Sequence, residues 1–217
     1  MTRQIVYRPQ TCFIMTKLGS PVPGEIKNIR RTLEKYLHQA GYTSIDANSS
    51  IRGKDFLLKI WELILAVPLG IAIISKDLSP YTLANIFYEI GFLQAYGRET
   101  LIIKTRDCYV PSDFVRTEYI EYDRSFGKKI SKFIQGLREQ AEYYATAGEL
   151  LEENPLLSID YYRRAFLITG NIKYKKMAQN IEQTASFDKQ TANTLKSFLH
   201  NQKTTTTRSE THTKAGR

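Results

Sequence analysis

The chain has 217 residues, of which 42% are hydrophobic, 12% aromatic and 24% charged, a composition typical of globular proteins and not of wholly disordered ones. Its net charge of +9 is divided equally among residues 1–124, 125–200 and 201–217, which contribute +3 each, so that only the last 17 residues are enriched in basic side chains. Proteins that follow a nucleic-acid backbone usually concentrate their bases in a stripe with interleaved aromatic residues. The first 200 residues show no such enrichment, which argues against a nucleic-acid partner.

The cysteines and the apolar runs argue against two further classes of protein. Cys12 and Cys108 belong to no CxxC motif and have no neighbouring histidine, so we expect free thiols and no metal site. The longest apolar run, LILAVPLGIAII, has 12 residues and contains Pro68 and Gly70, which makes it too short for a membrane span. The N-terminal segment MTRQIVYRPQ lacks the apolar core of a signal peptide. We expect a cytoplasmic protein with no membrane partner.

Strand and helix patterns alternate along the first half of the chain. An apolar strand at 12–15 precedes a turn rich in Gly and Pro and a helix at 25–40, in which Ile and Leu recur at helical spacing. The next predicted elements are a short strand within 42–50, a helix at 54–67, an unbroken apolar strand at 69–75, a helix ending at Gly97, a strand at 101–105 and an edge strand at 117–123. This order predicts an α/β fold with an open, doubly wound parallel sheet of the flavodoxin-like kind.

The chain divides into three predicted parts. The α/β pattern covers residues 1–124, and a helical extension covers residues 125–200, beginning with GKKISKFIQGLREQ. Residues 201–217 are polar and of low complexity, which predicts a disordered basic tail. Nucleic-acid binding through this tail stays open as a minor alternative, and its affinity would fall steeply with salt.

Polar residues occur in three loops that the predicted sheet would bring to one edge. Open α/β sheets bind ligands beyond the carboxyl ends of their strands, where the strand order reverses, and the loops at 16–23, 46–54 and 75–85 lie there. Thr16 and Lys17 offer a hydroxyl and a cation for a phosphate, although no GxGxxG motif accompanies them. The other candidates in these loops are Asp46, Arg52, Ser75 and Asn85, of which Asp46 and Arg52 could equally be ordinary surface charges.

Glu89 is the most conspicuous candidate, because it places a carboxylate in the otherwise aliphatic and aromatic helix NIFYEIGFLQAY. One helical stripe is apolar, and a second stripe combines the carboxylate with an amide and two aromatic rings: Asn85, Glu89, Phe92 and Tyr96. Such a stripe suits a sugar and a flat base, whereas the alternative is a partly exposed glutamate paired with Lys or Arg. A buried carboxylate without a partner is costly, so burial of Glu89 would indicate pairing, protonation or function.

The start of this helix decides how Glu89 is presented. With Thr82 or Asn85 as the N-cap, Glu89 stands in the first two turns and faces the crevice, where the helix dipole favours its charge. With Ser79 as the N-cap and Pro80 at the first helical position, Glu89 lies in the third turn and reaches the crevice less well. The sequence leaves both possibilities open.

The segment ANIFYEIGFLQAYGRETLIIK resembles the glutamate-containing segment of bacterial TIR-like predicted nucleotide-binding proteins. These are related to Toll/interleukin-1 receptor domains and to nucleoside 2-deoxyribosyltransferases. CFIMTKL, YTSIDANSSIRG and YVPSDFVRTEYIEYD are similar to further elements of the family, so the resemblance covers residues 12–124. It implies a TIR-like fold that takes a nucleotide as ligand or substrate, with no other cofactor.

The resemblance also implies roles for individual residues. Glu89 would be the catalytic carboxylate beside the ribose in an N-glycosidase that cleaves NAD or a related nucleotide. Asn85 and Tyr88 would bind substrate with the loop residues; Tyr88 could stack on a base or belong to the core. Ser75 stands where the family has an acid, and this departure favours the alternative of a nucleotide-sensing module that recruits a partner without turnover.

The segment EYYATAGELLEENPLLSIDYYRRAFLITGN resembles one tetratricopeptide-like helical hairpin with its turn at EENP. One hairpin cannot bury both faces alone, so it must pack on the sheet domain, on the following helix or on another subunit. We expect self-association through the TIR-like part or through these helices. The alternative is a simple cap on the first domain.

Overall fold

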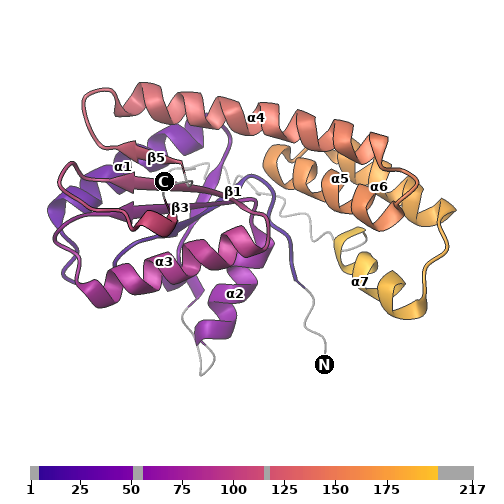
Figure 1. Ribbon diagram of the computed structural model, residues 1–217, viewed down its shortest axis with the longest axis horizontal. Helices are drawn as coiled ribbons and strands as arrows, with labels where there is room; N and C mark the ends of the chain where they lie inside the picture. The colour runs from indigo at the N-terminus through magenta and orange to yellow at the C-terminus, as the bar shows by residue number, and fades with distance from the viewer. Residues whose placement is uncertain (1–4, 51–55, 115–117, 200–217) are drawn as a thin grey trace, which may run out of the picture.

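The computed structural model describes residues 5–50, 56–114 and 118–199, which form an α/β sheet domain and a set of C-terminal helices (Figure 1). The strands are β1 (Thr11–Met15), β2 (Thr43–Ile45), β3 (Leu69–Ile74), β4 (Glu99–Lys104) and β5 (Tyr119–Glu121). The α-helices are α1 (Gly24–Gln39), α2 (Phe56–Ala66), α3 (Pro80–Ala95), α4 (Phe126–Leu150), α5 (Pro155–Thr169), α6 (Ile172–Thr184) and α7 (Lys189–Leu199), and two 3-10 turns are η1 (Ala47–Ser50) and η2 (Ser112–Phe114).

The five strands form one sheet in the order β2-β1-β3-β4-β5, and every neighbouring pair is parallel. This is the flavodoxin-like order. From β1 the chain adds β2 on one side and then β3, β4 and β5 on the other, so the strand order reverses between β1 and β3. β1 and β3 are buried along their whole length, as their unbroken apolar runs predict. The predicted open, doubly wound parallel sheet with a C-terminal helical extension is therefore confirmed.

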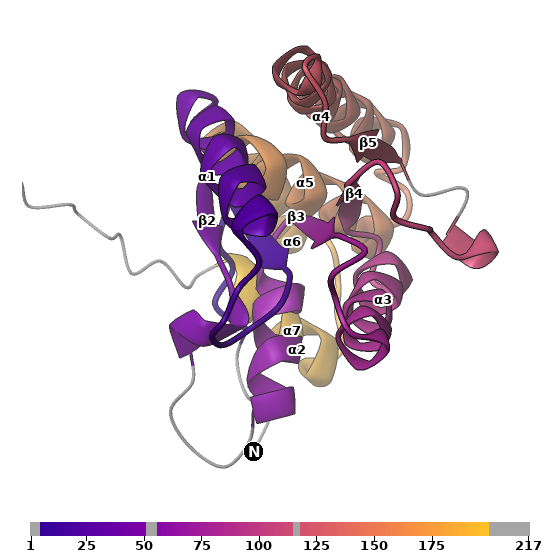
Figure 2. The same cartoon turned by 90° about the vertical axis from the view of Figure 1, so that its left-hand side faces the viewer.

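Two helical layers cover the sheet (Figure 2), with α1 and α4 on one face and α2 and α3 on the other. The helices turn their predicted apolar stripes to the core, as α3 does with Ile86, Ile90 and Leu93. α3 ends as predicted, because Tyr96 is its C-cap and Gly97 follows with a φ of 62°. That left-handed conformation favours glycine, so the turn into β4 is local in origin.

Helix α3 approaches the sheet closely because one strand residue has no side chain. Gly70 on β3 lies directly beneath Leu93, so that a Cβ atom added to Gly70 would collide with Leu93 Cδ1 and lie 3.1 Å from Met15 Cε. Leu93 and Met15 are both buried in the main core, where side chains are closely packed. The contact between Gly70 and Leu93 thus fixes the height of α3 above the sheet.

We expect Gly70→Ala to lower the free energy of unfolding by about 1–3 kcal/mol, because the added methyl group forces α3 or its side chains to move. Urea unfolding of the purified variant measures this loss. Gly136→Ala on the exposed face of α4 is the matched control, since no atom lies within 4 Å of the added Cβ there. The control should be neutral or more stable by up to about 1 kcal/mol, as alanine is the better helix former. Equal stabilities of the two variants would contradict this account of α3.

Helix α4 belongs to two cores. Its first half packs on the sheet domain through a run of buried side chains, which are Phe126, Ile130, Phe133, Ile134, Leu137 and Ala141. Its second half pairs with α5, where Gly148 lies against the ring of Tyr162 and its carbonyl accepts a 2.6 Å hydrogen bond from Ser158 Oγ. Tyr162 and Phe166 of α5 then form a second, smaller core with α6 and α7.

The helical extension is also bonded to the amino-terminal edge of the sheet. Tyr42 Oη donates a 2.7 Å hydrogen bond to the carbonyl of Ile168 on α5, and both residues are buried. Tyr144 Oη donates to Glu99 Oε1 at 2.7 Å, which ties α4 to the start of β4. The hairpin therefore packs on the sheet domain and on the helices that follow it, whereas packing on another subunit stays a prediction.

We expect Tyr42→Phe to cost about 1–3 kcal/mol of unfolding free energy, because the buried carbonyl of Ile168 loses its side-chain donor while the aromatic packing is kept. Thermal unfolding followed by circular dichroism measures the effect. Tyr143→Phe is the control, because Tyr143 is exposed on α4. A loss no greater than that of the control would show that the Tyr42 hydroxyl adds nothing to the junction.

No helix in the described ranges is long and apolar enough to cross a membrane. The predicted disordered tail at 201–217 lies outside the residues that the structure describes. The same holds for part of the predicted edge strand at 117–123, whose described strand is β5.

Candidate functional site

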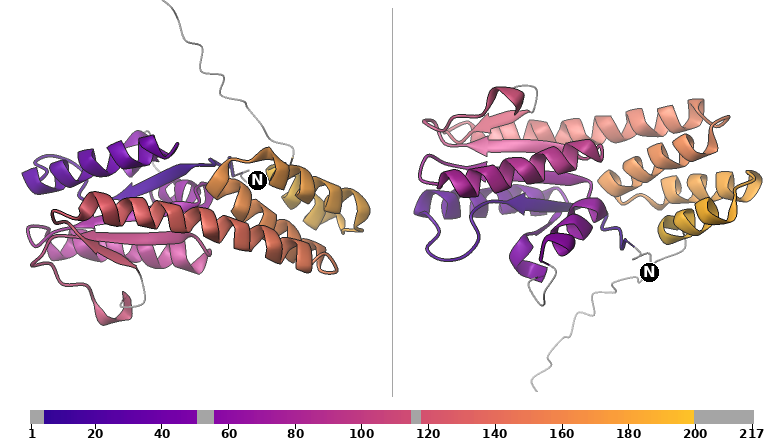
Figure 3. Two further views of the ribbon diagram at one scale, coloured as in Figure 1. Left: turned by 90° about the horizontal axis from the view of Figure 1, so that it is seen from above. Right: turned by 60° about the horizontal axis from the view of Figure 1, so that its bottom comes forward.

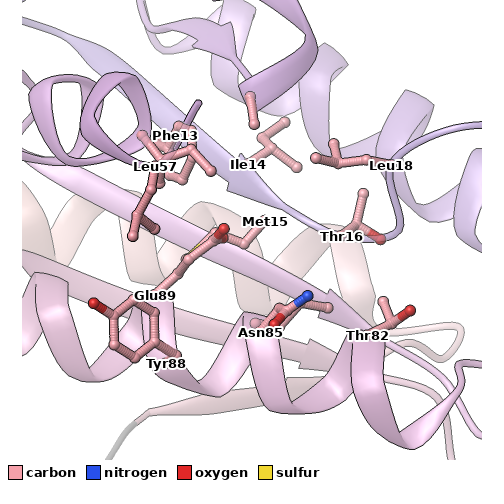
Figure 4. A pocket seen from close by; sticks show the side chains of 13 residues that line it. Phe13, Ile14, Met15, Thr16, Leu18, Leu57, Thr82, Asn85, Tyr88 and Glu89 are labelled. Carbon is pink, nitrogen blue, oxygen red and sulfur yellow. The ribbon is translucent and has the colours of Figure 1, made fainter. Parts of the chain in front are cut away.

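A pocket of about 290 Å³ lies between the carboxyl-terminal half of β1 and the two helices α2 and α3 (Figure 4). Its volume is near the lower end of the range for small-molecule sites, and it opens to solvent on one side. The described residues that line it are Phe13, Ile14, Met15, Thr16, Leu18, Ala47, Leu57, Ile60, Thr82, Asn85, Ile86, Tyr88 and Glu89. The polar side chains come mainly from α3, and the apolar ones come mainly from β1 and α2.

Helix α3 begins at Pro80 with Ser79 as its N-cap, and the Ser79 hydroxyl accepts the backbone N–H of Thr82 at 3.2 Å. Glu89 is therefore in the third turn, the arrangement for which the sequence predicts the poorer reach. That expectation about reach is wrong, because the pocket runs down alongside β1 and is not confined to the loops beyond the strand ends. Glu89 points from α3 across to Met15 on β1 (Figure 4).

The carboxylate of Glu89 is largely withdrawn from water and has no partner. Within the described ranges it makes no hydrogen bond and no ion pair, so the alternative of a glutamate paired with a surface Lys or Arg is wrong for those residues. Burial raises the pKa of Glu89 from 4.5 to about 7, because the apolar walls of the pocket disfavour the charged form. An ionised carboxylate that is partly buried without a partner lowers the stability of the fold. Such groups are often found at functional sites.

Three further polar side chains, Asn85, Thr82 and Thr16, line the same pocket toward the carboxyl end of β1 (Figure 4). Asn85, one helical turn before Glu89, is exposed and presents an amide with both donor and acceptor atoms. The Thr82 hydroxyl is 3.0 Å from that of Ser79. Thr16 Oγ1 at the end of β1 donates to the carbonyl of Ile73 at 3.1 Å, and its lone pairs can accept a further hydrogen bond. The set suits a ligand rich in hydroxyl groups.

The mouth of the pocket is apolar and aromatic. Tyr88 is 52% exposed and its ring stacks on Phe92 with centroids 6.5 Å apart, while Phe92 stacks in turn on Trp61 of α2 at 5.4 Å. Leu57 on α2 is equally exposed and lines the same mouth. Large apolar side chains held in the open beside a pocket offer a surface on which a flat ring can lie.

The structure brings four of the predicted site residues into one pocket. Thr16, Asn85, Tyr88 and Glu89 line the pocket. Lys17, which follows Thr16 in the sequence, Asp46 and Ser75 are not among the described lining residues. Arg52 lies outside the residues that the structure describes.

Asp46 and Ser75 are buried and have structural roles. Asp46 Oδ2 pairs with Arg30 at 2.7 Å, which fastens the end of β2 to α1. Ser75 is fully buried, and its hydroxyl accepts the backbone N–H of Asp77 at 3.3 Å in the turn after β3. Both residues follow a strand, as ligand-binding residues do in this fold. Their side chains, however, bond to other groups of the protein and do not line the pocket.

Nine of the thirteen described lining residues were not predicted as site residues, and Thr82 and Leu57 are two of them. Thr82 lies three residues before Asn85 and seven before Glu89, so the helical spacing of α3 could have shown it. Leu57 is a leucine on an amphipathic helix, and such a residue is ordinarily assigned to the core. Its exposure follows from the placement of α2 beside β1, which no local pattern encodes.

No group of three or more His, Cys, Asp and Glu side chains is placed to hold a metal ion in the described part of the chain.

No protein-family model and no curated protein matches the sequence. Similar solved structures include a 2-deoxyribosyltransferase from the psychrotolerant bacterium Bacillus psychrosaccharolyticus, with a TM-score of 0.43 and 10% identity over 56% of this chain and 90% of that one. A CMP N-glycosidase from Clostridium botulinum has a TM-score of 0.42 and 18% identity over 57% of this chain and 98% of that one. A likeness at these TM-scores carries no argument about what the pocket binds.

Proposed function

We propose that the protein cleaves the N-glycosidic bond of a nucleotide, with NAD as the favoured substrate and Glu89 as the catalytic carboxylate. The observation that carries the proposal is the partly buried Glu89, which has no partner among the described residues and lies in a pocket whose other groups suit a sugar and an aromatic ring. The resemblance of the segment around Glu89 to TIR-like nucleotide-binding proteins supports the same assignment.

The chemistry needs a carboxylate at this place. As the bond between C1′ and the base nitrogen breaks, its electron pair leaves with the base, and positive charge develops on C1′ and the ring oxygen of the ribose. Ionised Glu89 would stabilise that charge, or form a bond to C1′ that is later hydrolysed. Water supplies the hydroxyl group at C1′ and releases one proton to solvent, which completes the hydrolysis.

The composition of the pocket favours a pyridinium glycoside over an ordinary nucleoside. Glu89 is the one carboxylate among the described lining residues, whereas most glycosidases use a second carboxyl group to protonate the leaving group. Nicotinamide leaves NAD as a neutral molecule, because the electron pair of the broken bond neutralises the pyridinium nitrogen. That reaction therefore requires no proton donor.

The remaining groups have roles that follow from their positions. We assign Asn85, Thr82 and Thr16 to the ribose hydroxyls, and Tyr88 to the face of the leaving ring. We assign Lys17, which follows Thr16 in the sequence, to a phosphate of the substrate. A cavity of about 290 Å³ suits a riboside and not a whole dinucleotide, so the rest of NAD would lie across the open mouth.

The test is product analysis with the full-length protein at high concentration. Incubation with NAD should release free nicotinamide and an equal amount of ADP-ribose, while a purine or pyrimidine nucleoside 5′-monophosphate should react more slowly for lack of a proton donor. Faster release of a purine or pyrimidine base would keep the glycosidase proposal and overturn the preference for NAD. Absence of product from every substrate would sink the proposed activity.

The pH dependence distinguishes the role of the carboxylate. If ionised Glu89 stabilises the transition state, kcat/KM rises with pH and levels off above the pKa of about 7 in the free enzyme. A general acid with the same pKa would give the opposite slope. Rates measured from pH 5 to pH 9 decide between them, and a flat profile would contradict both.

A second candidate is a nucleotide-sensing module that binds without turnover. The burial of Ser75 at the end of β3 favours it, since the acid that TIR-like relatives have at this place is missing from the described lining. Calorimetry separates the two: micromolar binding of NAD together with the complete absence of nicotinamide release would support the sensing role.

A further inference from the structure

The turn between α4 and α5 forms a tip at the end of the helical extension that is far from the sheet (Figure 3). Three leucines are exposed there, with Leu150 79% exposed, Leu156 49% and Leu157 40%. The acidic residues Glu149, Glu152 and Glu153 surround them and are exposed as well. We call these six residues the acidic tip.

Among the residues that the structure describes, the glutamates of the acidic tip form no ion pair and its leucines pack into no core. The three glutamates make no ion pair or hydrogen bond through their side chains in the described ranges. The leucines belong to neither of the two described cores. An apolar group rimmed by charge of one sign is the composition of an interaction surface, since most monomers keep large apolar side chains apart on their surface.

The start of α6 has the opposite charge and a matching apolar residue. Ile172 is 45% exposed, and Lys173 and Lys176 are exposed on the same face of the helix, one and four residues further on. Neither lysine side chain makes an ion pair in the part of the chain that the structure describes. We call these three residues the basic patch; α6 starts at the end of the extension nearest the sheet (Figure 3).

We propose that the acidic tip of one molecule docks on the basic patch of a second copy of this chain. The pairing places the exposed leucines on Ile172 and the three glutamates beside Lys173 and Lys176, so that apolar area is buried and charges of opposite sign meet. Because two different surfaces meet, the contact is head-to-tail, and a pair of molecules retains one free tip and one free patch. Such a contact extends into rings or open chains of molecules.

Other occupants of the acidic tip fit less well. Nucleic acid and anionic membranes are repelled by three uncompensated carboxylates. The basic C-terminal segment 201–217 has the right charge, but NQKTTTTRSETHTKAGR contains no large apolar side chain that could cover the leucines. The basic patch supplies both the charge and the apolar group.

Sedimentation velocity of the full chain over a range of protein concentrations tests the proposal. Wild-type protein should associate as its concentration rises, and added salt should weaken the association because the charges at the rim are screened. The triple variant Glu149→Lys, Glu152→Lys, Glu153→Lys and the double variant Lys173→Glu, Lys176→Glu should each raise the dissociation constant at least tenfold. Leu150→Gln should weaken it without a change of charge. All of these residues are exposed, so thermal unfolding should show intact folds.

Mixing the two charge-reversed proteins provides the discriminating measurement. In the mixture the lysine tip of the first meets the glutamate patch of the second, and the unaltered tip of the second meets the unaltered patch of the first. The mixture should therefore associate although neither protein does so alone. Restored association would establish a head-to-tail contact between these two surfaces. Wild-type protein that stays monomeric up to its solubility limit, charge reversals without effect, or a mixture that fails to associate would each overturn the proposal.

Discussion

Glu89→Gln is expected to lower kcat for N-glycosidic cleavage about 10²–10³-fold, the loss usual when one group that stabilises transition-state charge is removed. Glutamine keeps the shape of the side chain and one of its two acceptor oxygens, but it carries no negative charge to place beside C1′. Since the substrate in its ground state has little charge on C1′, binding of the intact nucleotide should change far less than turnover.

The control for this experiment is Glu142→Gln, which removes an exposed carboxylate from α4, remote from the pocket. Its kcat should equal that of the wild type. Product release is followed at saturating nucleotide, and binding of the intact nucleotide is measured by calorimetry. Equal rates for Glu89→Gln and the wild type would show that Glu89 has no catalytic role, even if the protein does cleave nucleotides.

The same substitution is expected to stabilise the protein at alkaline pH. The pKa of Glu89 is raised from 4.5 in the unfolded chain to about 7 in the fold, so between these values the unfolded chain loses a proton that the folded protein retains. Stability therefore falls as pH rises through this window, and above pH 7 the ionised carboxylate costs about 2–3 kcal/mol after allowance for the open side of the pocket. Glutamine removes this cost.

Urea unfolding at pH 4.5 and at pH 8 measures the difference. The variant should exceed the wild type by no more than about 0.4 kcal/mol at pH 4.5, where the carboxyl group is neutral in the fold and half ionised in the unfolded chain, and by about 2–3 kcal/mol at pH 8. Glu142→Gln again serves as the control for the loss of one surface charge. An advantage of Glu89→Gln that is the same at both pH values would mean that burial of the charge is not its cause.

The parallel sheet could be predicted because its signals are local. Unbroken apolar runs in β1, β3 and β4, amphipathic helices between them and Gly97 after α3 all follow from neighbouring residues. The lengths of elements were less predictable, since β5 has three residues where seven were expected. At the sheet edge, the end of a strand depends on its single neighbour and not on propensity.

The candidate site was predictable only in part, because a pocket depends on how far apart elements pack. The spacing of α3 indicates Asn85 and Glu89 together, and the end of β1 indicates Thr16. The inward turn of Ser75 and the pairing of Asp46 with Arg30 depend on contacts between elements distant in sequence. The reach of Glu89 was underestimated because the pocket follows β1 downward, beneath the third turn of α3.

Helix α4 has a practical consequence for dissecting the protein. Since its first half fills the main core and its second half holds the hairpin, no cut within α4 separates the two parts cleanly. A fragment that stops before Phe126 would expose the apolar face on which α4 lies, and should aggregate or be degraded. Any fragment or chimaera that is meant to keep the pocket therefore has to include the first half of α4.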